Sequence, residues 1–269
     1  MSLKKKVNIA TLRHNNFKDL PSPIFFLSTG RTGTKWFANL FKQQKQLITF
    51  HQAVPTLAIQ NKFYYNILND KTLSEKTKYE IGKEIFLAAR EEYLLYSYKT
   101  QKNFLETNND MLFFAEVIAK LIPNSKFVHI YRHPGDFVRS GLARGWYQDN
   151  IVEQKMIKPN IANWQQLNRI EKIAWLWNES NTFIENFKQK IDKNRIFELN
   201  FSSFSIQDIM QLANFIGIKL NEKKINKLKN KKINTQPNPY PKYKDWTEKD
   251  KNTLKNICGK LAQKYGYKF

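Results

Sequence analysis

Two glycines and two basic residues stand between an apolar run and a segment with helical spacing. Residues 23–41 read P-I-F-F-L-S-T-G-R-T-G-T-K-W-F-A-N-L-F. Gly30 and Gly33 allow the backbone to approach a ligand, and the free N–H groups of a first helical turn attract an anion. The side chains that add charge or hydroxyl donors to this loop are Arg31, Thr32, Thr34 and Lys35. The segment therefore predicts a strand, an anion-binding loop and a helix.

The spacing of this loop differs from that of the nucleotide-triphosphatase P-loop, which reads G-x-x-x-x-G-K-[ST]. Gly30 and Gly33 are too close together, and Trp36 stands where a Ser or Thr would hold magnesium. A small-molecule kinase with a P-loop is therefore an alternative interpretation that the spacing disfavours.

A second apolar run also ends in polar residues, since residues 126–141 read K-F-V-H-I-Y-R-H-P-G-D-F-V-R-S-G. Pro134 suits a first helical turn, and Asp136 suits the helix dipole just after it. An Arg at the end of a strand and a hydroxyl on the next helix can converge on one phosphate, which the planar guanidinium binds through two parallel bonds. Arg132 and Ser140 are the candidate phosphate ligands.

Together and in this order, the two segments resemble the motifs of the sulfotransferase family, including its bacterial members, in which Arg often stands at the position of Arg31. The family transfers a sulfuryl group from 3′-phosphoadenosine 5′-phosphosulfate (PAPS) and releases adenosine 3′,5′-bisphosphate (PAP). S-T-G-R-T-G-T-K-W resembles its 5′-phosphosulfate loop, and R-x-P-x-D followed by Ser resembles its 3′-phosphate motif. The cofactor-binding residues implied by the resemblance are Arg31, Thr32, Gly33, Thr34, Lys35, Trp36, Arg132 and Ser140.

Within this set the resemblance implies that Arg31 contacts the sulfate and that Trp36 stacks on adenine. Trp36 also suits a core position on the apolar stripe of its helix. The resemblance extends to R-I-F-E-L-N-F near residue 200, although Asn200 and Phe201 replace a carboxylate often present in relatives. The basic stretch from residue 231 to 244 matches the family's nucleotide-covering flap only loosely.

Transfer of a sulfuryl group to a hydroxyl requires stabilisation of the leaving group and a base for the acceptor proton. Arg31 is expected to stabilise the leaving group. His51 follows a predicted strand and is the first candidate base, although a His at this position also suits a structural, hydrogen-bonded role. Glu116, at the end of another predicted strand, is the second candidate. No metal is implied.

Apolar runs alternate with helical periods, which predicts an α/β fold with a central, mostly parallel sheet flanked by helices. With the resemblance, residues 1–269 are expected to form a single domain with the P-loop-like sulfotransferase fold, and residues 1–20 a flexible N-terminal extension. The predicted strands are 24–28, 47–50, 111–115, 127–131 and 195–199. The predicted helices cover residues 36–41, 74–98, 164–177 and 204–216 and a last segment from Trp246.

The chain has 45 Lys and Arg against 23 Asp and Glu, a formal charge of +22, so a nucleic-acid-binding protein is the alternative from another class. Only eight of the 45 are Arg, and half of these gather around two loops rather than along a face, with Arg31 in the first loop and Arg132, Arg139 and Arg144 near the second. We therefore expect no nucleic-acid partner. The single cysteine and the lack of a long apolar segment favour a cytoplasmic protein. Its acceptor carries a hydroxyl, on a carbohydrate, lipid or small molecule, and neither acceptor identity nor oligomeric state follows from the sequence.

Overall fold

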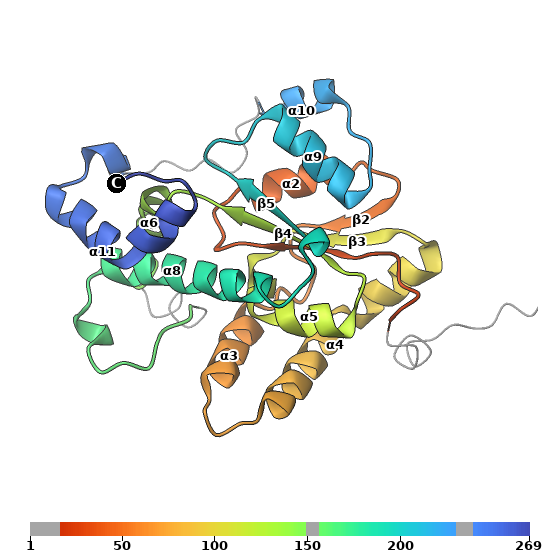
Figure 1. Cartoon of the computed structure of the whole chain (residues 1–269), viewed down its shortest axis with the longest axis horizontal. Coiled ribbons are helices and arrows are strands. Elements are labelled where there is room, and N and C mark those ends of the chain that lie inside the picture. The colour runs from red at the N-terminus through yellow and green to blue at the C-terminus, as the bar shows by residue number, and fades with distance from the viewer. Residues whose placement is uncertain (1–16, 149–155, 230–238) are drawn as a thin grey trace, which may run out of the picture.

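A five-stranded parallel sheet lies at the centre of the computed structural model, which describes residues 17–148, 156–229 and 239–269 (Figure 1). Its strands are β1 (Ile24–Leu27), β2 (Leu47–Phe50), β3 (Asn103–Glu106), β4 (Lys126–Tyr131) and β5 (Ile196–Asn200). Their order in the sheet is β2-β3-β1-β4-β5, and every pair of neighbours is parallel. The predicted α/β class is confirmed.

Helices cover both faces of the sheet (Figure 1). One face carries α2 (Thr34–Phe41), α9 (Ile206–Ile216) and α10 (Glu222–Lys229). The other carries α3 (Ala58–Asn69), α4 (Glu75–Thr100), α5 (Ala115–Leu121) and α8 (Arg169–Lys188). Both α6 (Pro134–Leu142) and α11 (Glu248–Lys264) pack against α8.

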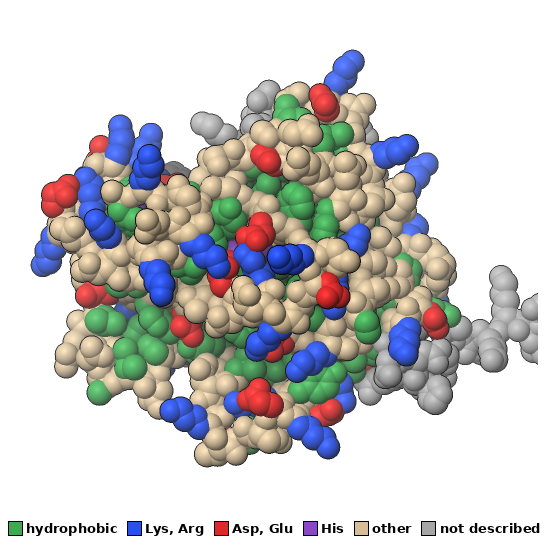
Figure 2. All heavy atoms as spheres, in the orientation of Figure 1, with side chains coloured by type: hydrophobic (Ala, Val, Ile, Leu, Met, Phe, Trp, Pro, Cys, Tyr) green, Lys and Arg blue, Asp and Glu red, His purple; other side chains and the backbone are tan. Residues whose placement is uncertain are grey.

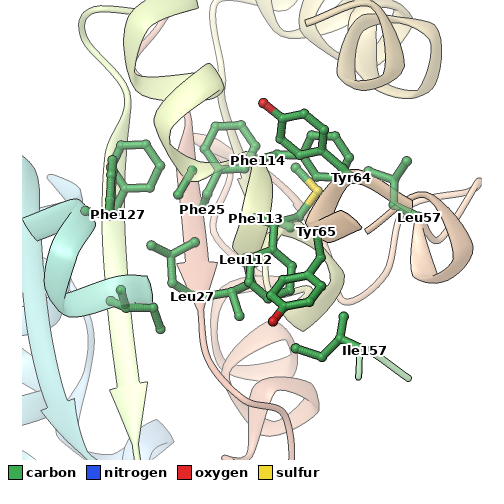
Figure 3. Close-up of a cluster of buried hydrophobic side chains, with 14 of the residues drawn as sticks. Phe25, Leu27, Leu57, Tyr64, Tyr65, Leu112, Phe113, Phe114, Phe127 and Ile157 are labelled. Atoms are coloured by element: carbon green, nitrogen blue, oxygen red, sulfur yellow. The ribbon is translucent and has the colours of Figure 1, made fainter. Parts of the chain in front are cut away.

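The alternation of side chains along β1 divides the apolar core into two layers. Phe25 and Leu27 point into the layer beneath α4, α5 and α8, where they lie near Phe127 (Figure 3). Ile24 and Phe26 point into the layer beneath α2 and α9. All four β1 residues are fully buried, which explains why this strand is continuously apolar rather than alternating in polarity.

The strand order places a ligand crevice at the carboxyl ends of β1 and β4. The chain leaves β1 toward β2 on one side of the sheet and leaves β4 toward β5 on the other. Ligands of open α/β sheets bind where the connections diverge in this way. Both predicted anion-binding motifs follow these two strands.

The prediction for the third strand was wrong. Residues 109–114 form a 3-10 helix, in which the Asn108 side chain accepts from the N–H of Asp110, and α5 follows directly. The third strand is instead Asn103–Glu106, only four residues long. A short apolar run does not distinguish a buried strand from a buried helical turn by periodicity, and here M-L-F-F-A packs as a turn.

The other expected elements differ from the structure mainly at their ends. The helix expected from residue 164 begins at Arg169, because Asn168 and Glu171 form a capping box there, and a separate 3-10 turn holds Trp164–Gln166. The last helix begins at Glu248. Among the described residues, no helix is long and apolar enough to cross a bilayer.

Two expected segments fall partly outside the described residues. Of the expected N-terminal extension, residues 1–16 lie outside, while Phe17 and Leu20 are buried in the core and so belong to the folded unit. Of the basic stretch 231–244, residues 231–238 lie outside. The described remainder includes Tyr240, whose carbonyl accepts from Arg139 Nε at 2.8 Å.

Candidate active site

The loop after β1 turns sharply before α2. Gly30, Arg31 and Gly33 have φ angles of 82°, 57° and 71°, in the left-handed region that favours glycine. A Cβ on Gly33 would lie 2.3 Å from the ring of Phe201, so only glycine fits beside this side chain of the chain segment after β5. α2 begins directly after this turn, at Thr34. Its first turn therefore opens on the crevice, as the sequence predicts.

Two motifs that lie about a hundred residues apart meet at this loop. Arg31 Nε donates to Ser140 Oγ at 3.0 Å, and Arg132 Nη1 donates to the carbonyl oxygen of Arg31 at 2.7 Å. Arg132 Nη2 also lies 3.4 Å from a carboxylate oxygen of Asp136. The candidate ligands of the two phosphates thus form one connected group.

Positive charge at this group exceeds the negative charge beside it. Burial, followed by the charges of Arg144 and Arg132, lowers the pKa of Arg31 to about 10. Among the described residues, no carboxylate forms an ion pair with Arg31 or Arg144, and Asp136 alone pairs with Arg132. Sequence reasoning noted Arg144 in a cluster but gave it no role. A polyanion bound here would supply the missing negative charge.

Two buried polar atoms at the site have no hydrogen-bond partner among the described residues, namely Thr32 Oγ1 and Arg132 Nε. Buried polar groups in folded proteins are almost always paired, because leaving one unpaired costs about 1–3 kcal/mol. Phosphate and sulfate oxygens are acceptors for both a hydroxyl and a guanidinium N–H. Arg132 lines the cavity together with Arg31, Lys35 and Arg144, whereas Thr32 does not. These cations, rather than the Thr32 hydroxyl, therefore fit a phosphate-bearing ligand.

A cavity of about 490 Å³ joins these groups. The expected site residues that line it are Arg31, Gly33, Thr34, Lys35, Trp36, His51 and Arg132. Thr32 lies buried behind the loop, and Ser140 reaches the site through its bond to Arg31. Phe201 also lines the cavity, and its ring faces the Arg132 guanidinium at 5.8 Å. Six of the eight expected cofactor-binding residues therefore line one cavity, and Thr32 and Ser140 do not.

Trp36 has features both of a core residue and of a residue that contacts a ligand. Its side chain is 8% exposed and packs on Phe37 and Phe204, and its indole N–H donates to the carbonyl of Leu228 in α10 at 3.0 Å. It also lines the cavity. Trp36 thus ties α2 to α10 and still presents part of its ring to a ligand.

His51 lies at the cavity wall, directly after β2. Its Nδ1 lies 3.0 Å from the carbonyl oxygen of Thr107, which follows β3. Because a carbonyl only accepts, Nδ1 carries the proton, and Nε2 of the neutral ring keeps its lone pair. Burial lowers the pKa of His51, and the charge of Lys35 lowers it further, while the bond to Thr107 opposes both. The ring is therefore neutral near pH 7, as a base must be.

Glu116 does not lie where the sequence placed it. It belongs to α5 rather than to a strand end, and its carboxylate pairs with Lys190 at 2.6 Å. It is not among the residues that line the cavity. Glu116 was expected at the carboxyl edge of the sheet, but the residues before it form a 3-10 helix rather than a strand.

The carboxylate that does end β3 is Glu106, and it is structural. Arg90 of α4 donates to both of its oxygens, at 2.7 and 2.8 Å, and both side chains are fully buried. Arg90 also donates to the carbonyls of Ala53 and Pro55. This buried pair holds the segment that follows His51. Its carboxylate could have been found from the sequence only if residues 103–106 had been predicted as the third strand.

One cluster elsewhere has the residue types of a metal site. His129, Glu185 and Glu198 bring one ligand atom each within 4.8 Å of one another. Lys188 Nζ, however, lies 2.6 Å from both carboxylates, and Lys264 also pairs with Glu185. The position of a cation is already filled by lysine, so this cluster is an ion-pair network that ties α11 to α8 and β5.

Comparisons with known proteins agree with this geometry. A family model described as the sulfotransferase family matches residues 23–222, and the chain therefore belongs to the sulfotransferase family. Membership implies that it is a transferase. No curated protein matches the chain significantly.

Solved sulfotransferases share the fold. The sulfotransferase domain from the Synechococcus PCC 7002 olefin synthase is 12% identical, with a TM-score of 0.54 over 94% of this chain and 97% of that one. STF9 from Mycobacterium avium is 13% identical, with a TM-score of 0.52 over 98% and 83%. Mouse SULT7A1, solved in complex with PAP, is 12% identical, with a TM-score of 0.51 over 97% and 91%. Identities this low show the fold alone.

Proposed function

We propose that this protein transfers a sulfuryl group from PAPS to an acceptor hydroxyl. The observation that carries the proposal is the cluster of Arg31, Arg132 and Arg144 around one cavity, where neither Arg31 nor Arg144 has a carboxylate partner among the described residues. Such a cluster requires a ligand with several negative charges and acceptor oxygens. The mouse sulfotransferase with the same fold is complexed with PAP, which supports the choice of nucleotide.

The residues divide the binding between the two motifs. Arg132 and Ser140 would hold the 3′-phosphate, and Trp36 would contact the adenine. Residues 31–35 would hold the 5′-phosphosulfate through their side chains and the N–H groups of the first turn of α2. PAPS supplies the activated sulfuryl group, and the acceptor oxygen forms a new bond to sulfur as the bond from sulfur to the phosphate oxygen breaks.

Two side chains would act on the reacting atoms. Arg31, which the charges of Arg132 and Arg144 surround, would stabilise the electron pair left on the phosphate oxygen. His51 would take the acceptor proton on Nε2, because Thr107 holds the other ring nitrogen as a donor. The second candidate, Glu116, has lost its positional argument, so His51 stands alone as the proposed base.

Titration calorimetry with PAP tests the nucleotide assignment. We expect PAP to bind more tightly than ATP with magnesium or a short oligonucleotide, which represent the kinase and nucleic-acid alternatives. On the face shown in Figure 2, Lys and Arg lie scattered among Asp and Glu, so this face has no stripe of positive charge of the kind that binds nucleic acid. Tighter binding of ATP or of the oligonucleotide would overturn the proposal.

Variants locate the site. Arg132→Ala should weaken PAP binding by about 1.5–3 kcal/mol per lost bond, or roughly tenfold to 150-fold, and Ser140→Ala by less. Lys42→Ala, which removes an exposed cation at the end of α2, is the control and should change little. Unchanged affinity in both site variants would mean that PAP binds elsewhere.

A further inference from the structure

The segment that follows α11, residues 265–269, lies against the turn that carries the second phosphate motif. α11 packs along α8 and ends at Lys264, and the chain then passes beside the start of α6 (Figure 1). Tyr267 and Phe269 place their rings against the ring of His133, with centroid distances of 5.1 and 6.0 Å. His133 is the residue directly after Arg132 and caps α6. A segment distant in the sequence therefore covers the turn that holds a proposed phosphate ligand.

The hydroxyl of Tyr267 donates a hydrogen bond to the end of β5. Asn200 Oδ1 accepts from the N–H of Ser202 at 2.9 Å, so the amide atom at this position is the oxygen and not the nitrogen. The Tyr267 hydroxyl lies 2.7 Å from the same oxygen and is therefore the donor. Tyr267 thus holds the first residues of the turn that follows β5.

The same turn is bonded to the backbone of the second motif. Ser202 Oγ accepts from the N–H of His133 at 3.1 Å, and the N–H of Phe201 donates to the carbonyl of Tyr131 at 2.8 Å. Residues 131 and 133 flank Arg132, so these two bonds fix the backbone on both sides of it. The ring of Phe201 also faces the Arg132 guanidinium at 5.8 Å.

The guanidinium of Arg132 leaves donors for a ligand. Its Nη1 donates to the Arg31 carbonyl at 2.7 Å, its Nη2 lies 3.4 Å from Asp136, and its Nε has no partner among the described residues. The placement of the guanidinium before a ligand arrives therefore depends on the backbone that carries it. Burial raises the pKa of Tyr267 to about 12 and the charge of Arg132 opposes this rise, so the two groups interact electrostatically.

We propose that Tyr267 is a positioning residue for the 3′-phosphate of the nucleotide. It acts through Asn200 and the turn after β5, which hold the backbone around Arg132 so that the guanidinium is in place before the phosphate binds. Tyr267 itself makes no contact with the ligand. The inference rests on the proposed function, and its effect is confined to the 3′-phosphate because residues 31–35 hold the 5′ group from another loop.

Tyr267→Phe tests the inference, because it keeps the ring on His133 and removes the donor to Asn200. Titration calorimetry compares PAP with adenosine 5′-monophosphate (AMP), which differs from PAP only in lacking the 3′-phosphate. PAP affinity should fall about three- to tenfold, the effect of one hydrogen bond, while AMP affinity stays within about twofold. Unchanged PAP affinity, or an equal loss for both nucleotides, would overturn the inference.

Tyr265→Phe is the matched control. The Tyr265 hydroxyl belongs to the same segment, but it donates to Glu185 of α8 at 3.0 Å rather than to the turn after β5. Its removal should leave the ratio of PAP affinity to AMP affinity unchanged. If this ratio fell as far as in Tyr267→Phe, any disturbance of the segment would suffice, and the role of Tyr267 would be refuted.

The Arg132→Ala background shows whether Tyr267 acts through Arg132. Once the guanidinium is gone, adding Tyr267→Phe should change the remaining PAP affinity by less than about twofold. A further three- to tenfold loss in the double variant would mean that Tyr267 acts by another route, which overturns the inference.

The wild-type titration separates the two levels of the argument. Failure of PAP to bind the wild-type protein would remove the proposed function and this inference with it. Normal PAP binding by the wild-type protein and an equal affinity in Tyr267→Phe would overturn this inference alone.

Discussion

Replacement of His51 by Asn tests the proposed base with little disturbance of its surroundings. The Asn amide nitrogen can keep the bond that His51 Nδ1 donates to the Thr107 carbonyl, but it offers no lone pair to accept a proton. Positioned bases contribute about 10²–10⁴ in rate, so kcat should fall by that factor, which corresponds to about 2.7–5.4 kcal/mol of activation free energy. PAP affinity should stay within about threefold, because His51 is not among the proposed phosphate ligands.

The pH profile gives a second, independent readout. The pKa of His51 lies below its ordinary value of 6.5, because the site buries the ring and Lys35 lies near it. The neutral ring is the active form, so the rate is full above that ordinary value and falls as pH drops through the lowered pKa. His51→Asn should lose this acid limb, once kcat is measured at saturating PAPS and acceptor at every pH.

The matched control is Thr107→Val. It removes the hydroxyl that lies 3.2 Å from His51 Nδ1 but keeps the carbonyl that orients the ring. Its kcat should stay within about threefold of normal. Near-normal turnover in His51→Asn, or equal losses in both variants, would refute the assignment of His51 as base.

Three further predictions concern the surroundings of the site. Trp36→Ala should weaken PAP binding by about 1–3 kcal/mol if the ring stacks on adenine, whereas Trp36→Phe should keep most of the affinity; calorimetry on folded variants decides. Arg90→Met leaves the buried carboxylate of Glu106 without its partner and should lower the unfolding free energy by about 3–5 kcal/mol in urea titrations. A loss below about 1 kcal/mol would contradict the buried pairing. Burial lowers the pKa of His129 in the folded protein to about 4. Between pH 7 and 5 this histidine therefore becomes protonated in the unfolded chain but stays neutral in the folded chain. This effect should remove about 2 kcal/mol of stability over that interval, and the His129→Gln variant should lose correspondingly less.

Local patterns determined much of the site. Each phosphate motif is a strand, a turn and the start of a helix within about 15 residues, and these depend on glycine conformations, a Pro at a helix start and apolar periodicity. The loop from Gly30 to Gly33, and the position of Arg132 at the end of β4, follow from such local preferences. The parallel α/β fold follows from the alternation of strands and helices.

The sequence left undetermined what depends on contacts between distant segments. The four-residue strand β3 shows no period of its own, and pairing with β1 and β2 decides that it is a strand. Because the third strand was predicted at residues 111–115, Glu116 rather than Glu106 was expected at the end of that strand. The buried pair of Glu106 with Arg90 was therefore not predicted. The bond from Arg31 to Ser140 joins residues 109 positions apart, and the orientation of His51 depends on a carbonyl 56 positions away. A single chain carries no signal for such pairs, because their energies arise only when packing brings them into contact and removes water around them.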